Sequence, residues 1–184
     1  MPKNSRFLSD ESKSTGVSDY IIMPKTEDEV REVMRVNNSK GNKIVIRGLG
    51  TGLCGGCVPN GEAVMTTEYV QSAVFLGKDD RGYYLRVPAS ISIGEIGKIL
   101  SGDLSHVSDA TDGAVASIKS EGVEYFYPVD PTESGGSLGG NIATNASGPR
   151  TYRYGPTRDW VRSIHVVLAD GSLLEIKRGE IKAD

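Results

Sequence analysis

The sequence is poor in cysteine and in long apolar segments, and each shortage excludes a class of protein. Among 184 residues only Cys54 and Cys57 are cysteines, too few for a disulfide framework. No apolar run approaches the roughly 20 residues that span a bilayer. The N-terminus has no apolar stretch behind its first basic residue, so it does not resemble a secretory signal. We therefore predict a cytoplasmic protein without a transmembrane segment.

Positive charge is also scarce, since the formal net charge is -3. A nucleic-acid partner requires a clustered positive field, so nucleic acid is not expected as a partner. The shares of hydrophobic residues (38%) and charged residues (24%) are those of a globular chain. The length allows one ordinary domain or two small lobes that share a core.

Glycine, in contrast, is abundant: there are 23 glycines, nearly twice the usual share of about 7%. They gather in two clusters, at residues 48–56 and 135–148. Because glycine lets the backbone approach a ligand closely, two such clusters in one small domain indicate ligand contact at two places.

The first third of the chain predicts a βαβ-like unit after a loose leader at residues 1–18. A short strand at 20–23 precedes Thr26, which has the features of a helix N-cap, and Gly41 is placed to end that helix. A second strand at 43–47 has a composition typical of burial on both faces.

The remainder predicts a mixed sheet. Strands are expected at 63–66, 83–87, 125–127 and 161–168, and the last is followed by an Asp170-Gly171 hairpin turn and a strand at 173–177. Ser92 and Glu95 have the spacing of a capping box, so a helix is expected up to Leu100. Residues 101–122 are interpreted as a surface insertion.

The first glycine cluster directly follows a strand, and residues 50–55 even fit the G-x-G-x-x-G spacing of a Rossmann site. That fingerprint must open a helix, whereas here Gly55-Gly56 and Val58-Pro59-Asn60-Gly61 are turn sequences. The closing Gly-Lys-Ser/Thr of a Walker loop is also missing. Two readings remain open: a nest of backbone N–H groups around phosphate oxygens, or a tight glycine turn without a ligand.

The second cluster follows a rigid stretch in which Pro128 and Pro131 restrict the backbone. Small hydroxyl and amide residues lie between its glycines, which leaves room for a planar ring system. The alternative is a helix packed closely through Gly139, Gly140 and Ala143, and the two readings are compatible.

Together these segments resemble the FAD-binding domain of the vanillyl-alcohol oxidase/p-cresol methylhydroxylase (PCMH-type) flavoprotein family, most of all the branch of D-lactate dehydrogenases and the glycolate oxidase FAD subunit. The segments that carry the resemblance run in family order from about Tyr20 to Gly179. They are Pro24-Lys25-Thr26 with Glu29-Val30, Arg47-Gly48-Leu49-Gly50-Thr51-Gly52, Gly55-Gly56, Tyr127-Pro128 with Asp130-Pro131, Gly139-Gly140-Asn141 with Ala143-Thr144-Asn145-Ala146, Arg153-Tyr154-Gly155, and Val166-Val167-Leu168-Ala169-Asp170-Gly171.

The resemblance implies an α+β fold of two small α/β lobes with FAD between them: a βαβ N-terminal lobe (19–70) and a larger lobe with a mixed or antiparallel sheet (71–184). It implies that residues 48–52 cradle the FAD pyrophosphate and that the second cluster lines the rest of the cofactor. The expected cofactor-binding residues are Arg47, Gly48, Leu49, Gly50, Thr51, Gly52, Gly55, Gly56, Pro128, Asp130, Pro131, Thr132, Ser134, Gly135, Gly136, Ser137, Gly139, Gly140, Asn141, Ala143, Thr144, Asn145 and Ala146.

Family members that bind flavin covalently carry a histidine where this chain has Thr51, or a cysteine near Gly135, so the resemblance implies non-covalent FAD. It further implies oxidation of a 2-hydroxy acid, of the D-lactate or glycolate class, to a 2-oxo acid by hydride transfer to FAD. The family's cap domain and catalytic histidines correspond to positions after residue 184, so no catalytic residue is assigned. A partner subunit or electron acceptor is expected, and the alternative is a non-catalytic flavin-binding module.

Four other features have plainer interpretations. Cys54 and Cys57 have C-x-x-C spacing but complete no zinc site, and no metal is expected. His106 is expected at the surface and His165 as a hydrogen-bonded structural residue. Arg150, Arg153, Arg158 and Arg162 surround Trp160, which favours salt bridges or contact with the FAD phosphates. A nicotinamide-dependent Rossmann protein, the weakest alternative, predicts a helix that begins within residues 50–55.

Overall fold

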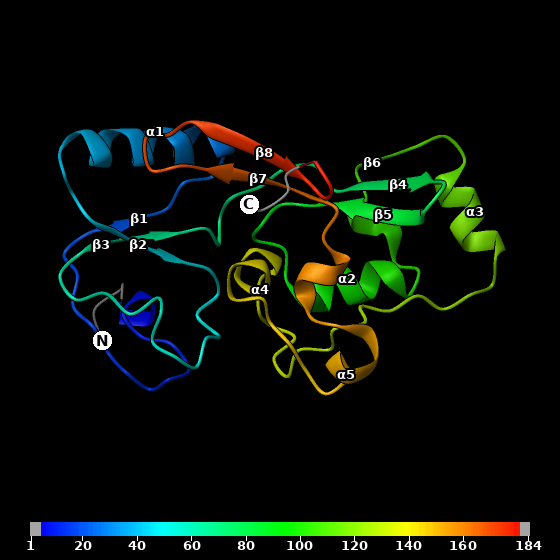
Figure 1. Ribbon diagram of the computed structural model, residues 1–184, viewed down its shortest axis with the longest axis horizontal. Coiled ribbons are helices and arrows are strands. Elements are labelled where there is room, and N and C mark those ends of the chain that lie inside the picture. Colours follow the sequence, from blue (N-terminus) through cyan, green and yellow to red (C-terminus); the bar gives the residue numbers. More distant parts are fainter. Residues whose placement is uncertain (1–4, 181–184) are drawn as a thin grey trace.

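The computed structural model describes residues 5–180, and Figure 1 shows them as two lobes side by side. The strands are β1 (Ile21–Ile22), β2 (Ile44–Arg47), β3 (Ala63–Thr66), β4 (Phe75–Asp79), β5 (Gly82–Arg86), β6 (Asp109–Ala110), β7 (Ser163–Val167) and β8 (Leu173–Lys177). The helices are α1 (Glu27–Ser39), α2 (Ile93–Leu100), α3 (Ala114–Ser120), α4 (Leu138–Thr144) and α5 (Thr151–Tyr154), with 3-10 turns η1 (Ser5–Phe7), η2 (Leu104–His106) and η3 (Thr157–Trp160). The predicted α+β class is confirmed.

The first lobe contains the predicted βαβ-like unit. Its strands lie in the order β1-β3-β2, and both pairings with β3 are parallel. The Thr26 side chain caps α1 by accepting a hydrogen bond from the Glu29 N–H at 3.2 Å, and Gly41 follows the helix with φ +68°. The prediction that the second strand is buried on both faces was wrong, because β2 is an edge strand and Ile46 is 47% exposed.

The prediction of a loose leader at 1–18 was also wrong for its described part. Phe7 is only 2% exposed and Asp10 8%, and burial of a phenylalanine is worth about 1.5–3 kcal/mol. The Gly16 N–H donates to the Leu8 carbonyl at 2.7 Å, and the Val17 N–H donates to the Pro59 carbonyl at 3.1 Å. Residues 5–17 are therefore part of the first lobe; residues 1–4 lie outside the described part of the chain.

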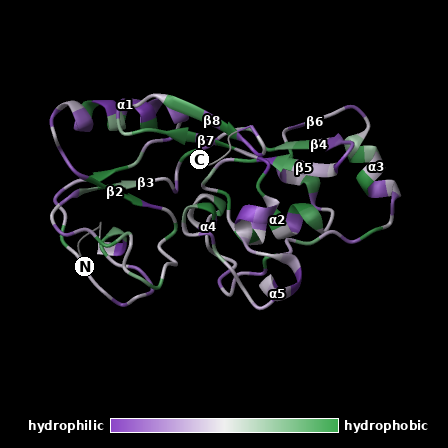
Figure 2. Cartoon of the chain, in the orientation of Figure 1, coloured by the Kyte–Doolittle hydropathy of each residue, from purple (hydrophilic) through white to green (hydrophobic). Residues whose placement is uncertain are grey.

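The second lobe is built on the sheet β5-β4-β6, in which β4 pairs antiparallel with β5 and parallel with β6. The capping box of α2 is present, since the Ser92 hydroxyl accepts from the Glu95 N–H and the Glu95 carboxylate accepts from the Ser92 N–H. Ile91, Ile93, Ile96 and Ile99 form the core with Val74. Figure 2 shows hydrophobic residues along β2 and β3 of the first lobe, whereas α1 carries many hydrophilic ones.

Two predictions for the second lobe need correction. Residues 101–122 are more than a surface insertion, because β6 joins the sheet and Ala114 in α3 is 1% exposed. Residues 125–127 form no strand. Their aromatic rings pack against other segments instead: Phe126 lies edge-on to Tyr154, with centroids 5.7 Å apart, and Tyr83 lies edge-on to Tyr125.

The predicted hairpin is present, with β7 antiparallel to β8 and Gly171 at φ +81° in the turn. It connects the two lobes. The Arg31 side chain of α1 donates to the Gly171 carbonyl at 3.1 Å, and Arg162, just before β7, pairs with Asp79 of β4 at 2.7 Å. In Figure 1 the hairpin runs beside α1 toward the second lobe. The boundary at residue 70 lies between β3 and β4, but the lobe division itself stays a prediction.

Candidate cofactor site

The first glycine cluster forms an open loop after β2. No helix begins within residues 48–57, and Gly50 and Gly55 have φ angles of +74° and +71°. The Rossmann alternative is therefore wrong, because its fingerprint requires a helix at this point. Among the described residues, no backbone N–H from residue 48 to residue 55 donates a hydrogen bond to another group of the protein. The loop thus presents a run of free donors, as an anion-binding nest does.

Arg47 lies beneath this loop and is 7% exposed. Its Nη1 donates to the Gly48 carbonyl at 3.0 Å, and its Nη2 donates to the carbonyls of Arg6 (2.9 Å) and Ser9 (3.2 Å). A Cβ atom on Gly50 would collide with the Arg47 guanidinium. Glycine is therefore required at position 50 both for its backbone conformation and for space.

The second glycine cluster is a short turn followed by a helix. The Ser137 side chain caps α4 by accepting from the Gly140 N–H at 3.3 Å. Gly139 packs against the backbone of Ala89, since an added Cβ would lie 2.9 Å from the Ala89 carbonyl oxygen. The alternative interpretation, a helix packed through Gly139, Gly140 and Ala143, is therefore correct for Gly139 but not for Ala143, which is exposed.

The two clusters meet. A Cβ atom on Gly48 would lie 2.7 Å from the Ser137 hydroxyl, and one on Gly136 would lie 3.1 Å from the Thr51 hydroxyl. The Ser92–Ser137 bridge and the hydrogen bond that the Ile93 N–H donates to the Gly136 carbonyl attach the second cluster to the start of α2. Segments about 85 residues apart in sequence thus pack closely against each other through glycines and hydroxyls.

Other predicted residues occupy more varied places. Pro128 is buried, whereas Thr132, Ser134, Gly135, Ala143 and Thr144 are exposed. The carboxylate of Asp130, at φ +50°, pairs with Arg150 at 3.1 Å. The Asn145 side chain accepts from the Arg158 N–H at 3.1 Å, and the Ala146 carbonyl accepts from the Thr157 hydroxyl at 2.7 Å. These last polar groups hold the chain after α4 together rather than face the two glycine clusters.

The residues present fit a dinucleotide cofactor in two respects. The free N–H groups of residues 48–55 suit a pyrophosphate, which offers only acceptors. In addition, Oδ1 of Asn141 is buried without a hydrogen-bond partner in the described structure, while its Nδ2 donates to the Ser137 carbonyl at 2.9 Å. A buried polar atom without a partner is costly, so an acceptor left free at this junction suits a ligand that carries a donor.

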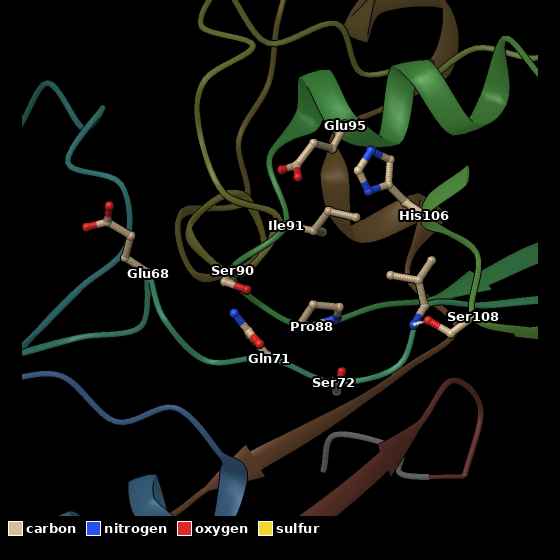
Figure 3. A pocket seen from close by; sticks show the side chains of 10 residues that line it. Glu68, Gln71, Ser72, Pro88, Ser90, Ile91, Glu95, His106 and Ser108 are labelled. Carbon is tan, nitrogen blue, oxygen red and sulfur yellow. Dashed lines mark hydrogen bonds between the residues drawn. The ribbon is translucent and has the colours of Figure 1, made fainter. Parts of the chain in front are cut away.

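A cavity of about 340 Å³ lies beside these segments, between the connection from β3 to β4 and the start of α2. Figure 3 shows Glu68 on one side of it and Glu95 and His106 on the other, with Ser90 between them. Hydrogen bonds from the Ser92 hydroxyl and N–H lower the pKa of Glu95. No sequence pattern marked these residues as a site; only the capping box gave a signal, and it concerned Glu95 alone.

Within residues 5–180 no group of three or more His, Cys, Asp or Glu side chains is arranged to hold a metal ion. The interpretations of His165 and of the arginines around Trp160 are supported in part. His165 lies 3.3 Å from the Glu27 carboxylate, as expected of a hydrogen-bonded structural residue. Three of the four arginines around Trp160 form the predicted salt bridges, namely Arg150, Arg158 and Arg162. In the same part of the chain, no helix has the length and apolar character needed to cross a bilayer.

The fold is a two-lobed α+β domain, and its glycine loops suit a nucleotide cofactor without a Rossmann helix. The chain matches the FAD binding domain family over residues 18–120 and 111–177. It therefore belongs to this PCMH-type FAD-binding family, as the sequence predicted.

Curated relatives agree with this assignment. The chain is 35% identical to a D-2-hydroxyglutarate dehydrogenase of Xanthomonas citri pv. viticola over 88% of its length, 29% identical to a D-lactate dehydrogenase of Anaerostipes hadrus over 94%, and 30% identical to glycolate oxidase subunit GlcD of Bacillus subtilis over 85%. It spans only 30%, 32% and 29% of these proteins, respectively. Among solved structures, 6-hydroxy-D-nicotine oxidase of Arthrobacter nicotinovorans shares the fold, with a TM-score of 0.67 at 19% identity over 97% of this chain and 35% of that one.

Proposed function

We propose that this chain is the cofactor-binding part of a flavin-dependent oxidoreductase that oxidises a 2-hydroxy acid to a 2-oxo acid. The observation that carries the proposal is the run of unpaired N–H groups at residues 48–55, which meets the second glycine cluster through Gly48 and Ser137. When bound, FAD supplies the acceptor for the two electrons removed from the substrate.

The chain's own residues bind and orient the cofactor in this proposal. The N–H groups of residues 48–52 hold the pyrophosphate, and Ser137, Asn141 and the glycines around them line the neighbouring part of the dinucleotide. The cavity bounded by Ser90 and Glu95 offers further room along the same surface, and its volume of about 340 Å³ is within the range of small-molecule sites. Neither a histidine at position 51 nor a cysteine at position 135 is present, which supports non-covalent binding.

The substrate class rests on the relatives. Their names specify D-2-hydroxyglutarate, D-lactate and glycolate, all of which are 2-hydroxy acids. Because the chain spans about 30% of these proteins, we assign no catalytic acid or base within it. One relative is named as a subunit, which supports a partner subunit as a source of the remaining parts. The cytoplasmic location stays a prediction.

The test is to purify the chain, add FAD, remove free flavin and record the visible spectrum. We expect a flavin spectrum, and a chain that remains colourless contradicts the proposed cofactor role. A second step mixes the flavin-bound protein without oxygen with D-lactate, glycolate or D-2-hydroxyglutarate. Bleaching of the flavin supports a complete active site. Retained colour with all three acids supports the alternative, a flavin-binding module that needs other parts for catalysis.

A further inference from the structure

Arg47 has an unusual set of partners for a buried cation. Only 7% of the residue is exposed, yet its guanidinium forms no ion pair within residues 5–180. Its two terminal nitrogens donate to neutral carbonyls, that of Gly48 on the glycine loop and those of Arg6 and Ser9 on the N-terminal segment, whereas its Nε is buried without a partner among the described residues. Burying a guanidinium without a carboxylate partner costs free energy unless carbonyl acceptors replace the lost water. Because Arg47 bonds both to the loop and to the N-terminal segment, the conformation of the loop depends on that segment.

The contact with Gly48 also fixes which way the N–H of Leu49, one of the loop's donors, points. A trans peptide unit directs its carbonyl and its N–H in opposite directions. Because the Gly48 carbonyl points toward Nη1 of Arg47 at 3.0 Å, the N–H of the same peptide unit, which belongs to Leu49, points away from Arg47. The guanidinium thus lies on the carbonyl side of this peptide unit and leaves the Leu49 N–H free.

The N-terminal segment supports Arg47 and the loop on that side. The Phe7 ring, 2% exposed, lies 5.7 Å from the Arg47 guanidinium carbon. Farther along, Oδ2 of Asp10 lies 3.8 Å from the place of a Cβ on Gly52, and it lies 3.7 Å from the Cys57 sulfur. The segment is itself held by the hydrogen bond from the Val17 N–H to the Pro59 carbonyl. Residues 5–17 therefore line one side of the loop from its start to its end.

We infer that Arg47 is a positioning residue for the pyrophosphate loop rather than a cofactor contact, and that residues 5–17 are a clasp that holds it in that role. The inference rests on the proposed function, since it concerns the same loop. Residues 5–17 lie before the first strand and contain none of the glycines that would approach FAD, so their effect on the cofactor acts through Arg47 and the loop.

The experiment measures FAD affinity by the quenching of flavin fluorescence in the whole chain and in three variants. Arg47→Met removes every donor to the carbonyls, and we expect the Kd for FAD to rise at least tenfold. Arg47→Lys keeps a donor and the charge, so we expect a partial rescue. Phe7→Ala leaves every charge in place and weakens only the clasp, and we expect a rise of about threefold to tenfold.

Ile99→Val is the matched control, because Ile99 is fully buried in the core of the second lobe and its shortening lowers stability without touching the clasp. FAD affinity should stay within twofold of the wild type in this variant. If Arg47→Met binds FAD as the wild type does, or if the affinities of all variants simply follow their melting temperatures, the inference is wrong. If Arg47→Met weakens binding while Phe7→Ala leaves it unchanged, Arg47 acts on the phosphates directly, which also overturns it.

A measurement without cofactor separates this inference from the proposed function. Hydrogen exchange of the ligand-free chain should show protected N–H groups at Gly16 and Val17, which donate to Leu8 and Pro59, and Arg47→Met should remove that protection. If the wild-type chain binds no FAD, the proposed function is wrong. The hydrogen-exchange measurement needs no FAD, so it still shows whether Arg47 holds residues 5–17 in place. Unchanged exchange in Arg47→Met shows that the clasp does not depend on Arg47.

Discussion

The two glycine clusters have similar compositions and opposite structures. In the first, the N–H groups of residues 48–55 have no partner within the described chain. In the second, the N–H groups are largely used: those of Leu138 and Gly139 donate to the carbonyls of Ile91 and Ala89, and that of Gly140 donates to Ser137. Glycine serves the first cluster by permitting a left-handed backbone and the second by removing a side chain between two packed backbones. The comparison shows that glycine content alone does not reveal whether a glycine permits a left-handed backbone or allows close packing.

The largest expected effect tests the packing role of the second cluster. Gly139→Ala places a Cβ 2.9 Å from the Ala89 carbonyl oxygen, and such overpacking should lower the free energy of unfolding by about 1–3 kcal/mol. Gly97→Ala is the matched control, because Gly97 is also helical and an added Cβ meets nothing within 4 Å. It should raise stability by about 0.5–1 kcal/mol. Urea unfolding of both variants measures the two changes in the free energy of unfolding. Equal changes would show that Gly139 is not packed more closely than Gly97.

The next effect tests the conformational role of the first cluster. Gly50→Ala puts a side chain at φ +74° and against the Arg47 guanidinium, at a cost of about 1–3 kcal/mol for the loop conformation. We expect FAD affinity to fall at least tenfold while the second lobe keeps its stability. Gly97→Ala lies outside the expected cofactor-binding residues and has open space around its Cβ, so it should bind FAD as the wild type does. Titration with FAD checks both variants, and a similar loss in Gly97→Ala would contradict the special role of position 50.

The smallest effect lies outside both clusters and serves as a negative control for them. Hydrogen bonds from Tyr125, Tyr83 and Lys78 lower the pKa of Glu121 from its ordinary 4.5 to about 2. A carboxyl whose pKa is lowered on folding stabilises the fold above its unfolded pKa, and that contribution is lost as the pH falls from 4.5 toward 2. Because Glu121 is exposed, the effect should be small.

Glu121→Gln should therefore flatten the pH dependence of unfolding between pH 4.5 and pH 2 and leave FAD affinity at neutral pH unchanged. Thermal unfolding at several pH values and one FAD titration measure the two outcomes. An unaltered pH profile would show that the network around Glu121 does not form in solution, and a loss of FAD affinity would show that the clusters are not the only determinants of binding.

Much of the fold could be predicted from local signals. Thr26 with its acidic turn, the Ser92–Glu95 capping box and the Asp170-Gly171 turn each act within a few residues, and each was confirmed. The prediction that both glycine clusters serve one cofactor came from family resemblance, because local patterns carry no information on segments that lie so far apart.

The misses have physical reasons. Strand β4 was not predicted, because Gly77 interrupts its apolar residues. Glycine is nevertheless required at this position, since a Cβ on residue 77 would overlap the Tyr84 ring. Residues 125–127 have a strand-like composition, but their aromatic rings pack on other segments and the backbone pairs with no strand. The N-terminal segment is polar along most of its length, and a single buried ring, Phe7, decides its place.

The β7–β8 hairpin has a consequence for how the chain is made. Helix α1 is complete by residue 39, yet its Arg31 finds the Gly171 carbonyl 140 residues later. Closing so long a loop costs entropy before any contact repays it, and contacts this distant in sequence slow folding. During synthesis the contacts of α1 with the hairpin therefore form only after β7 and β8 have left the ribosome, long after α1 itself is complete.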